Sequence, residues 1–137
     1  MTVQIKSFQQ DNQRAVNQFY KRFKQNVNCN RSDKIYVALD KSAANTAIVG
    51  AVIIRKTDNF LLFRSLYVAP EYRRQGLGAK LTQLALRGIK EQVYCLCQSE
   101  LIDYYVDLNF RAAHNIKLES KQINSKIKKG YCLMQYP

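Results

Sequence analysis

The sequence of 137 residues has no apolar run long enough to cross a bilayer. Its longest apolar run, residues 47–54, is eight residues long and contains a glycine, whereas a membrane helix needs about 20 apolar residues. The stretch "MTVQIKSFQQDNQ" lacks the basic, apolar and small-residue segments of a secretory signal. These absences predict a cytoplasmic protein that does not span a membrane.

Metal ligands and disulfides are also scarce. The cysteines, which form no C-x-x-C pair, are Cys29, Cys95, Cys97 and Cys132, and the one histidine is His114. Structural zinc takes about four such ligands at close spacing, so we expect no metal. With 47% apolar residues, the chain can build a core without disulfides, and we expect reduced cysteines. Because Cys95 and Cys97 alternate with Leu96, they should share one face of a strand, and we expect a structural or surface role for His114.

The charge is strongly unbalanced. Lysine and arginine total 22 against 10 acidic residues, which gives a net charge of +12. Such an excess favours polyanions, including nucleic acid, phosphate-rich cofactors and acidic surfaces. The basic residues are spread along the chain, without a run of five like charges or an RNA-binding aromatic motif. We therefore do not expect nucleic acid as a partner.

Hydrophobic periodicity predicts an α/β chain that forms a single domain over residues 1–137, with no repeat or linker. A first helix lies within residues 11–25, with Ala15, Val16, Phe19 and Phe23 on its apolar stripe and Asp11 or Asn12 as its cap. Three neighbouring antiparallel strands follow within residues 34–40, 47–58 and 60–68. Next come a helix from Gly78 to near Lys90, a buried strand at 93–97, a serine-capped helix within 99–110, and strands near 113–118 and 130–135 joined by a polar connection.

The loop "RRQGLG", residues 73–78, precedes the second helix. Glycines let the backbone approach a ligand closely, and the first amides of a helix carry the positive end of its dipole. Arginines add forked donors that suit phosphate oxygens. The spacing fits neither a P-loop nor a dinucleotide fingerprint. The pattern favours an anion site, with a loop that merely turns the chain as the alternative.

This stretch resembles a known family. Arg73, Gly76 and Gly78 match the R/Q-x-x-G-x-G/A signature of the GNAT-type (Gcn5-related) N-acetyltransferases, and "SLYVAPEYRRQGLGAKL" and "DYYVDLNF" are similar to that family's segments across nearly the whole chain. The resemblance implies the acyl-CoA N-acyltransferase fold. That fold has a mixed, mostly antiparallel central sheet flanked by helices, and its fourth and fifth strands splay apart at the cofactor site.

The resemblance also implies which residues bind acetyl-CoA, the expected co-substrate. Backbone groups of Leu66, Tyr67 and Val68 would pair with the pantetheine arm, and a strand amide near Val68 would polarise the thioester carbonyl. The residues that would surround the pyrophosphate are Arg73, Arg74, Gln75, Gly76, Leu77, Gly78 and Ala79. Gln98 stands where the family often has an asparagine that touches the cofactor arm.

Tyr105 matches the tyrosine that protonates the departing CoA thiolate in many family members. A phenol with a pKa of about 10 is protonated at neutral pH and can donate to sulfur. The alternative is that Tyr105 only packs in the core, and its neighbour Tyr104 should face elsewhere on the helix.

One feature departs from the family pattern. Leu62 stands where many members carry a carboxylate base, so the base is unassigned, with Glu71, Glu100 and Asp103 as available acids. The sequence therefore predicts direct acetyl transfer to a primary amine, on a small molecule or a protein. A catalytically weak CoA-binding module of the same fold is the alternative. The positive charge disfavours polyamine acceptors, and the sequence leaves a homodimer open.

Overall fold

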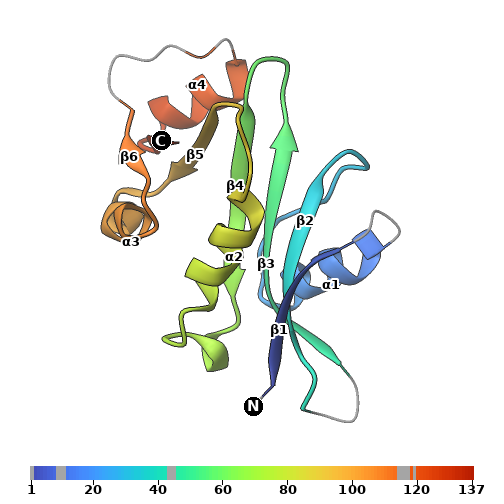
Figure 1. Cartoon of the computed structure of the whole chain (residues 1–137). Coiled ribbons are helices and arrows are strands. Elements are labelled where there is room, and N and C mark those ends of the chain that lie inside the picture. The colour runs from blue at the N-terminus through green and yellow to red at the C-terminus, as the bar shows by residue number, and fades with distance from the viewer. Residues whose placement is uncertain (1, 9–11, 43–45, 114–117, 119) are drawn as a thin grey trace. The chain divides into compact units, whose positions relative to one another are not determined.

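The computed structural model describes residues 2–8, 12–42, 46–113, 118 and 120–137. The chain forms two compact units, Met1–Lys56 with Phe63–Ile89 and Thr57–Leu62 with Lys90–Pro137. Figure 1 labels most of their helices and strands. The expectation of one domain over residues 1–137 stays a prediction, and each unit is described by itself.

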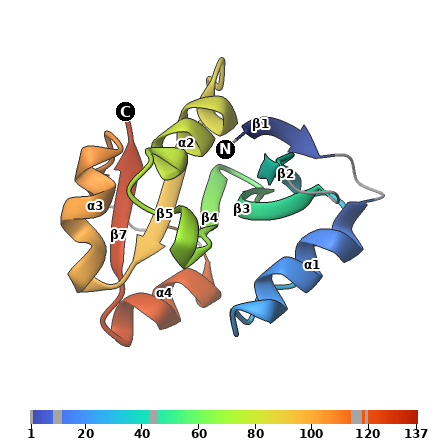
Figure 2. The ribbon, with the colours of Figure 1, turned by 90° about the horizontal axis from the view of Figure 1, so that it is seen from below.

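The first unit contains a sheet with helices on both faces. Its elements are β1 (Val3–Phe8), α1 (Gln13–Arg22), β2 (Lys34–Asp40), β3 (Ala47–Lys56), the later part of β4 (Leu61–Val68), the short 3-10 helix η2 (Pro70–Tyr72) and α2 (Leu77–Leu86). The strands follow the order β1-β2-β3-β4. β1 pairs antiparallel with β2, and β2 pairs antiparallel with β3. Figure 2 shows α1 and α2 on opposite faces of these strands.

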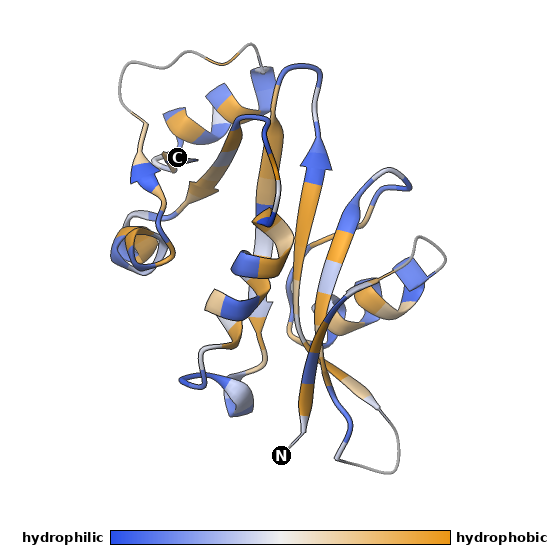
Figure 3. Cartoon of the chain, viewed as in Figure 1, coloured by the Kyte–Doolittle hydropathy of each residue, from blue (hydrophilic) through white to orange (hydrophobic). Residues whose placement is uncertain are grey.

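β3 is the centre of this core. Its residues 49–54 are all buried, as expected for a strand covered on both faces, and Figure 3 shows β3 as hydrophobic over most of its length. Gly50 lies close to α2, because a Cβ at this position would lie 3.2 Å from Leu81 Cδ1 and 3.4 Å from the Cβ of Ala38. The absence of a side chain at Gly50 therefore sets how closely α2 packs on the sheet.

The second unit is built around β5 (Val93–Cys97) and β7 (Cys132–Tyr136), which pair antiparallel. The other elements are the 3-10 helix η3 (Ser99–Leu101), α3 (Ile102–Asp107), β6 (Arg111–Ala112) and α4 (Lys121–Lys128). β4 begins in this unit, where Leu61 and Leu62 pair parallel with Val93 and Tyr94. A second apolar cluster consists of Phe60, Tyr94, Ile123 and Leu133, with Leu62 and Leu96 packed against it.

The mixed, mostly antiparallel sheet of seven strands confirms the predicted fold class. The helix that follows the glycine loop, the three successive strands and the strand at 93–97 are also confirmed, although α2 ends at Leu86 and not near Lys90. Both Cys95 and Cys97 are buried, and Leu96 packs against the cluster on the other face of β5, as their alternation predicts.

Other predictions were wrong or incomplete. Neither β1 nor α4 was predicted, because β1 alternates partly exposed residues and α4 has a single buried residue, Ile123. Ser99 does not cap a helix, since α3 begins after η3 and its Leu101 N-cap makes no side-chain hydrogen bond. In α1, Val16 and Phe19 are buried as predicted. Ala15 is exposed instead.

Three further predictions concern masked positions. The strand expected near 113–118 falls largely outside the described residues, and so does His114. Asp11, one of the two expected caps of the first helix, lies outside them as well, while the other, Asn12, is the N-cap residue but makes no side-chain capping bond.

Candidate functional site

The loop between β4 and α2 is fixed by backbone hydrogen bonds in the first unit. The Ala69 N–H donates to the Val49 carbonyl at 2.8 Å, which ties the end of β4 to β3. Pro70 opens η2, where the Tyr72 N–H donates to the Ala69 carbonyl at 2.9 Å. Proline is common at the first position of a helix because its ring fixes φ at a helical value. The loop thus begins at a residue that is hydrogen-bonded to the sheet.

A side-chain bond fastens the same loop to β2. The Tyr72 hydroxyl donates a short hydrogen bond to Asp40 Oδ2, and the Ser42 hydroxyl and N–H donate to Oδ1 at 2.5 and 2.9 Å. These bonds, first from Ser42 and then from Tyr72, lower the pKa of Asp40 from 3.8 to about 2, and the bond to Asp40 raises the pKa of Tyr72. Asp40 is therefore a carboxylate that holds the loop through Tyr72.

Gly76 shapes the start of α2. It is the N-cap, its φ of 74° lies in the left-handed region, and a Cβ there would meet no atom within 4 Å. The first intrahelical bond runs from the Lys80 N–H to the Gly76 carbonyl at 3.1 Å. The preceding amides, those of Leu77, Gly78 and Ala79, belong to the turn whose N–H groups have no acceptor within a helix.

No side chain of the described loop caps this turn, and residues 77–80 include no acid. Gly76 is exposed, whereas Leu77 and Gly78 are buried. The turn therefore presents main-chain donors and the positive end of the α2 dipole to an incoming anion.

The loop arginines differ in their contacts. Arg73 Nε donates to the Val68 carbonyl at 2.9 Å, and its guanidinium lies 5.2 Å from the centroid of the Tyr67 ring. Arg74 and Gln75 are exposed, and Arg74 has a φ of 66°. Arg73 thus holds the loop against the end of β4, and its remaining donors add positive charge beside the α2 turn.

The strand segment ahead of the loop is locally bent. Ser65 has a φ of 60°, which is rare for a residue with a side chain. The buried Tyr20 of α1 donates from its hydroxyl to the Ser65 carbonyl at 2.6 Å and supports this conformation. The next residues, Leu66, Tyr67 and Val68, are half-buried, so a bend precedes the segment that was predicted to pair with the cofactor arm.

Tyr105 lies in α3 of the second unit and is 8% exposed. Its ring packs edge-on against Phe110 and Tyr104, with centroids 5.7 and 5.5 Å apart. Burial, followed by the nearby Cys95 thiol, raises the pKa of Tyr105 above 10. The phenol is therefore a proton donor throughout the physiological range. Tyr104 is 43% exposed and faces elsewhere, as predicted.

The other predicted positions of this unit are Gln98 and Leu62. Gln98 is exposed and stands between β5 and η3, where its carbonyl accepts from the Leu101 N–H at 2.9 Å. Leu62, which aligns with the family's carboxylate, packs against the apolar cluster of this unit. Because leucine has no titratable group, the chain has no base at that position, and the surrounding side chains are apolar.

Several residues that shape the site were not predicted from the sequence. They are Tyr20, Asp40, Arg64, Ser65 and Tyr72. Tyr20 lies four residues after Val16 of the helical stripe, and this spacing was the one available signal. The others act through contacts between distant segments, which sequence periodicity does not report.

Two negative findings apply to the described part of the chain. None of its helices combines the length and apolar composition needed to cross a membrane. No group of three or more His, Cys, Asp or Glu residues is placed to hold a metal ion.

The fold and the glycine loop at the start of α2 define the class of acyl-CoA N-acyltransferase folds. The family model described as "Acetyltransferase (GNAT) domain" matches residues 31–114. This is more than half of the chain, and the chain belongs to the GNAT acetyltransferase family. As a member of this family, the protein belongs to the class of acyltransferases. A comparison with curated protein sequences found no match.

Solved structures share the fold at low sequence identity. ElaA of Escherichia coli is 12% identical with a TM-score of 0.67, covering 99% of this chain and 100% of that one. NAA60 of Arabidopsis thaliana, in complex with acetyl-CoA, is 16% identical with a TM-score of 0.67 and 98% coverage of both chains. The PaiA N-acetyltransferase of Thermoplasma acidophilum, in complex with coenzyme A, is 11% identical with a TM-score of 0.65 and 99% coverage of both.

Proposed function

We propose that this protein transfers the acetyl group of acetyl-CoA directly to a primary amine. The observation that carries the proposal is the uncapped first turn of α2, with Gly76 at a φ of 74° and Arg73 beside it. Main-chain N–H groups, the helix dipole and a guanidinium suit a diphosphate. The complexes of similarly folded proteins with acetyl-CoA and coenzyme A support the same donor.

The rest of the donor would lie along β4. The diphosphate would contact residues 73–79, and the pantetheine arm would pair with the backbone of Leu66, Tyr67 and Val68. Gln98 would also contact the arm, as the family resemblance implies. The carbonyl of Val68 already accepts from Arg73, but a carbonyl oxygen has a second lone pair for a ligand donor.

The reaction joins the amine nitrogen to the thioester carbonyl carbon while the carbon–sulfur bond breaks. The thiolate takes a proton from the Tyr105 hydroxyl, and a main-chain amide of the strand segment 66–68 stabilises the negative charge that develops on the carbonyl oxygen. The amine proton leaves to water, because Leu62 occupies the position of the family's base, and the Tyr105 phenolate takes a proton back from water to close the cycle. Such a route favours amines that are partly neutral at the working pH.

A turnover assay tests the proposal. CoA thiol release is measured with a panel of primary amines for wild type and for Tyr105→Phe, with Tyr104→Phe as the control on the neighbouring exposed ring. We expect Tyr105→Phe to lower kcat about 100-fold, within the usual range for general acids. The affinity for acetyl-CoA should not change, and Tyr104→Phe should stay within about twofold of wild type.

The same assay separates enzyme from binding module. Equal kcat in wild type and Tyr105→Phe would remove the tyrosine from the mechanism. Tight acetyl-CoA binding without thiol release for any amine would favour the catalytically weak CoA-binding module, which the apolar surroundings of Leu62 support.

A further inference from the structure

An ion pair joins β3 to the segment between α1 and β2 in the first unit. Arg55 of β3 donates to both carboxylate oxygens of Asp33, from Nε at 3.0 Å and from a terminal nitrogen at 2.8 Å. The Asn30 N–H also donates to Asp33 Oδ2 at 2.7 Å, and the Asp33 side chain has no exposed surface. The Asp33 carboxylate therefore accepts hydrogen bonds from Arg55 and from the Asn30 N–H of the adjoining turn.

Arg64 of β4 is a second cation close to this pair. It is half-buried, and its Nε donates to the neutral Ser65 hydroxyl at 3.3 Å. Within the described ranges, that is its one hydrogen bond, and the ion pair of Arg55 with Asp33 is the one salt bridge. Burial and repulsion from Arg55 lower the pKa of Arg64, yet an arginine stays charged at physiological pH. The terminal nitrogens of Arg64 keep their donors for a ligand.

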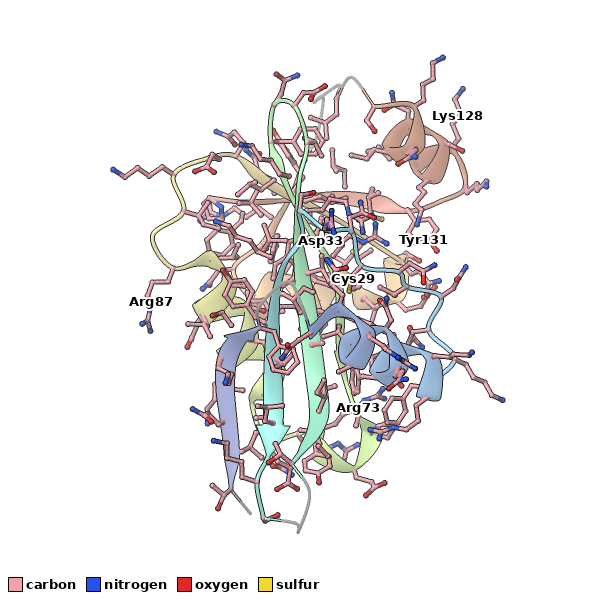
Figure 4. All side chains as sticks on the ribbon, turned by 90° about the vertical axis from the view of Figure 1, so that its right-hand side faces the viewer. Cys29, Asp33, Arg73, Arg87, Lys128 and Tyr131 are labelled. Carbon is pink, nitrogen blue, oxygen red and sulfur yellow. The ribbon has the colours of Figure 1, made fainter. Side chains whose placement is uncertain are left out.

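The remaining titratable neighbours do not neutralise Arg64. Burial and the charge of Asp33 raise the pKa of the Cys29 thiol to about 11, so the thiol is neutral. The Tyr20 hydroxyl donates to the Ser65 carbonyl. Figure 4 shows Cys29 and Asp33 on the same segment, which connects α1 to β2. Together, the side chains of Arg55, Arg64 and Asp33 carry a net charge of +1, which is partly shielded from water.

The position of Arg64 relates this charge to the proposed reaction. Arg64 precedes the bend at Ser65 and lies two residues before Leu66, where the strand segment for the cofactor arm begins. A diphosphate at Gly76 would lie beyond the other end of that segment, so the arm would run from Val68 toward Leu66. Because two residues span at most about 7 Å of chain, the Arg64 backbone lies within that distance of Leu66, on the side of the thioester.

We propose that Arg64 binds a carboxylate of the acceptor, so that the acceptor is an amino acid or another amine that carries a carboxylate close to the reacting nitrogen. This inference rests on the proposed function, because it places the thioester at the Leu66 end of the segment. A guanidinium fork pairs with a carboxylate through two parallel hydrogen bonds. Because the Asp33 carboxylate is hydrogen-bonded to Arg55, it does not compete with the acceptor's carboxylate for Arg64.

The test compares matched ligands and matched variants. Binding of the twenty common L-amino acids and of their amides is measured by calorimetry in the presence of CoA, and thiol release is measured with acetyl-CoA. The variants are Arg64→Gln, Arg64→Lys and Arg87→Gln, the last of which removes an exposed charge after α2 in the same unit. We expect at least one amino acid to bind about tenfold or more tightly than its amide in wild type.

Arg64→Gln should abolish that preference, Arg64→Lys should keep part of it, and Arg87→Gln should leave it unchanged. Acetyl-CoA affinity should stay within about twofold in every variant, which also shows that the variants fold. Equal binding of acids and amides in wild type, or a preference that survives in Arg64→Gln, would overturn the inference. Loss of acetyl-CoA binding in wild type would instead overturn the proposed function.

Discussion

Asp40 connects the end of β2 to the loop that precedes α2, and its effect depends on its charge. Hydrogen bonds from Ser42 and Tyr72 hold its pKa at about 2, below the ordinary 3.8. A carboxyl group whose folded pKa is depressed stabilises the fold above its unfolded pKa, and this contribution is lost as the pH falls through the folded value. Asp40 therefore contributes fully above about pH 4 and progressively less toward pH 2.

The corresponding prediction concerns Asp40→Asn. We expect its Tm to be lower than that of wild type at pH 6, with a difference that shrinks between pH 4 and pH 2 because protonation removes the same charge from wild type. Thermal unfolding followed by circular dichroism across this range measures the difference. Tyr72→Phe removes one donor and should reduce the pH dependence. A Tm difference that stays constant from pH 6 to pH 2 would show that Asp40 is not held as a carboxylate.

Single residues also show where sequence reasoning ends. The glycines of the loop and Tyr105 were found because they belong to short motifs, and Gly76 has the left-handed φ that a side chain would disfavour. Ser65 shares that conformation without any local signal, since the Tyr20 hydroxyl that supports it lies 45 residues away in the chain. Arg64 was not predicted as a site residue for a similar reason, because Arg55 and Asp33 come from other segments.

At the scale of elements, α2 is placed by the close approach of its Leu81 to Gly50. A side chain at Gly50 must displace Leu81 Cδ1, which lies 3.2 Å from the position of a Cβ. Overpacking of this kind costs about 1–3 kcal/mol. A side chain at Gly50 and the side chain of Leu81 therefore compete for the same space between β3 and α2.

A double-mutant cycle measures this coupling. Gly50→Val should destabilise the protein by about 1–3 kcal/mol, and Leu81→Ala by about 2–5 kcal/mol. In the double variant, the valine fills space vacated by the leucine. The combined loss should therefore be smaller than the sum by about 0.5 kcal/mol or more. Urea unfolding gives all three free energies. Strict additivity would mean that Leu81 does not limit the space at Gly50.

Element prediction succeeded where a segment is apolar nearly throughout and failed where its contacts are one-sided. β3 and β5 were predicted because nearly all of their residues are apolar. α4 looked like a polar connection because it buries Ile123 alone. That residue joins Phe60, Tyr94 and Leu133 from three other segments, and such a cluster is visible once the chain has folded.

At the scale of the whole molecule, the net charge of +12 agrees with a polyanionic donor and an acceptor that carries a carboxylate. Composition alone allowed several polyanions. The order of elements around the glycine loop narrowed the choice to one family, whose model matches residues 31–114. The acceptor could not be predicted from the motif, because the charge balance of Arg55, Arg64 and Asp33 depends on how three segments meet.

The central claim is that the diphosphate of acetyl-CoA binds to the first turn of α2. Gly76 and Gly88 offer a matched test, since their φ values are 74° and 72° and a Cβ at either would meet no atom within 4 Å. An aspartate therefore introduces equal charge and similar strain at each, but only Gly76 adjoins the first turn of α2. Calorimetric titration with acetyl-CoA should show a Kd raised about tenfold or more in Gly76→Asp, equivalent to about 1.4 kcal/mol, and changed less than about twofold in Gly88→Asp. The same Kd in wild type and both variants would contradict the claim.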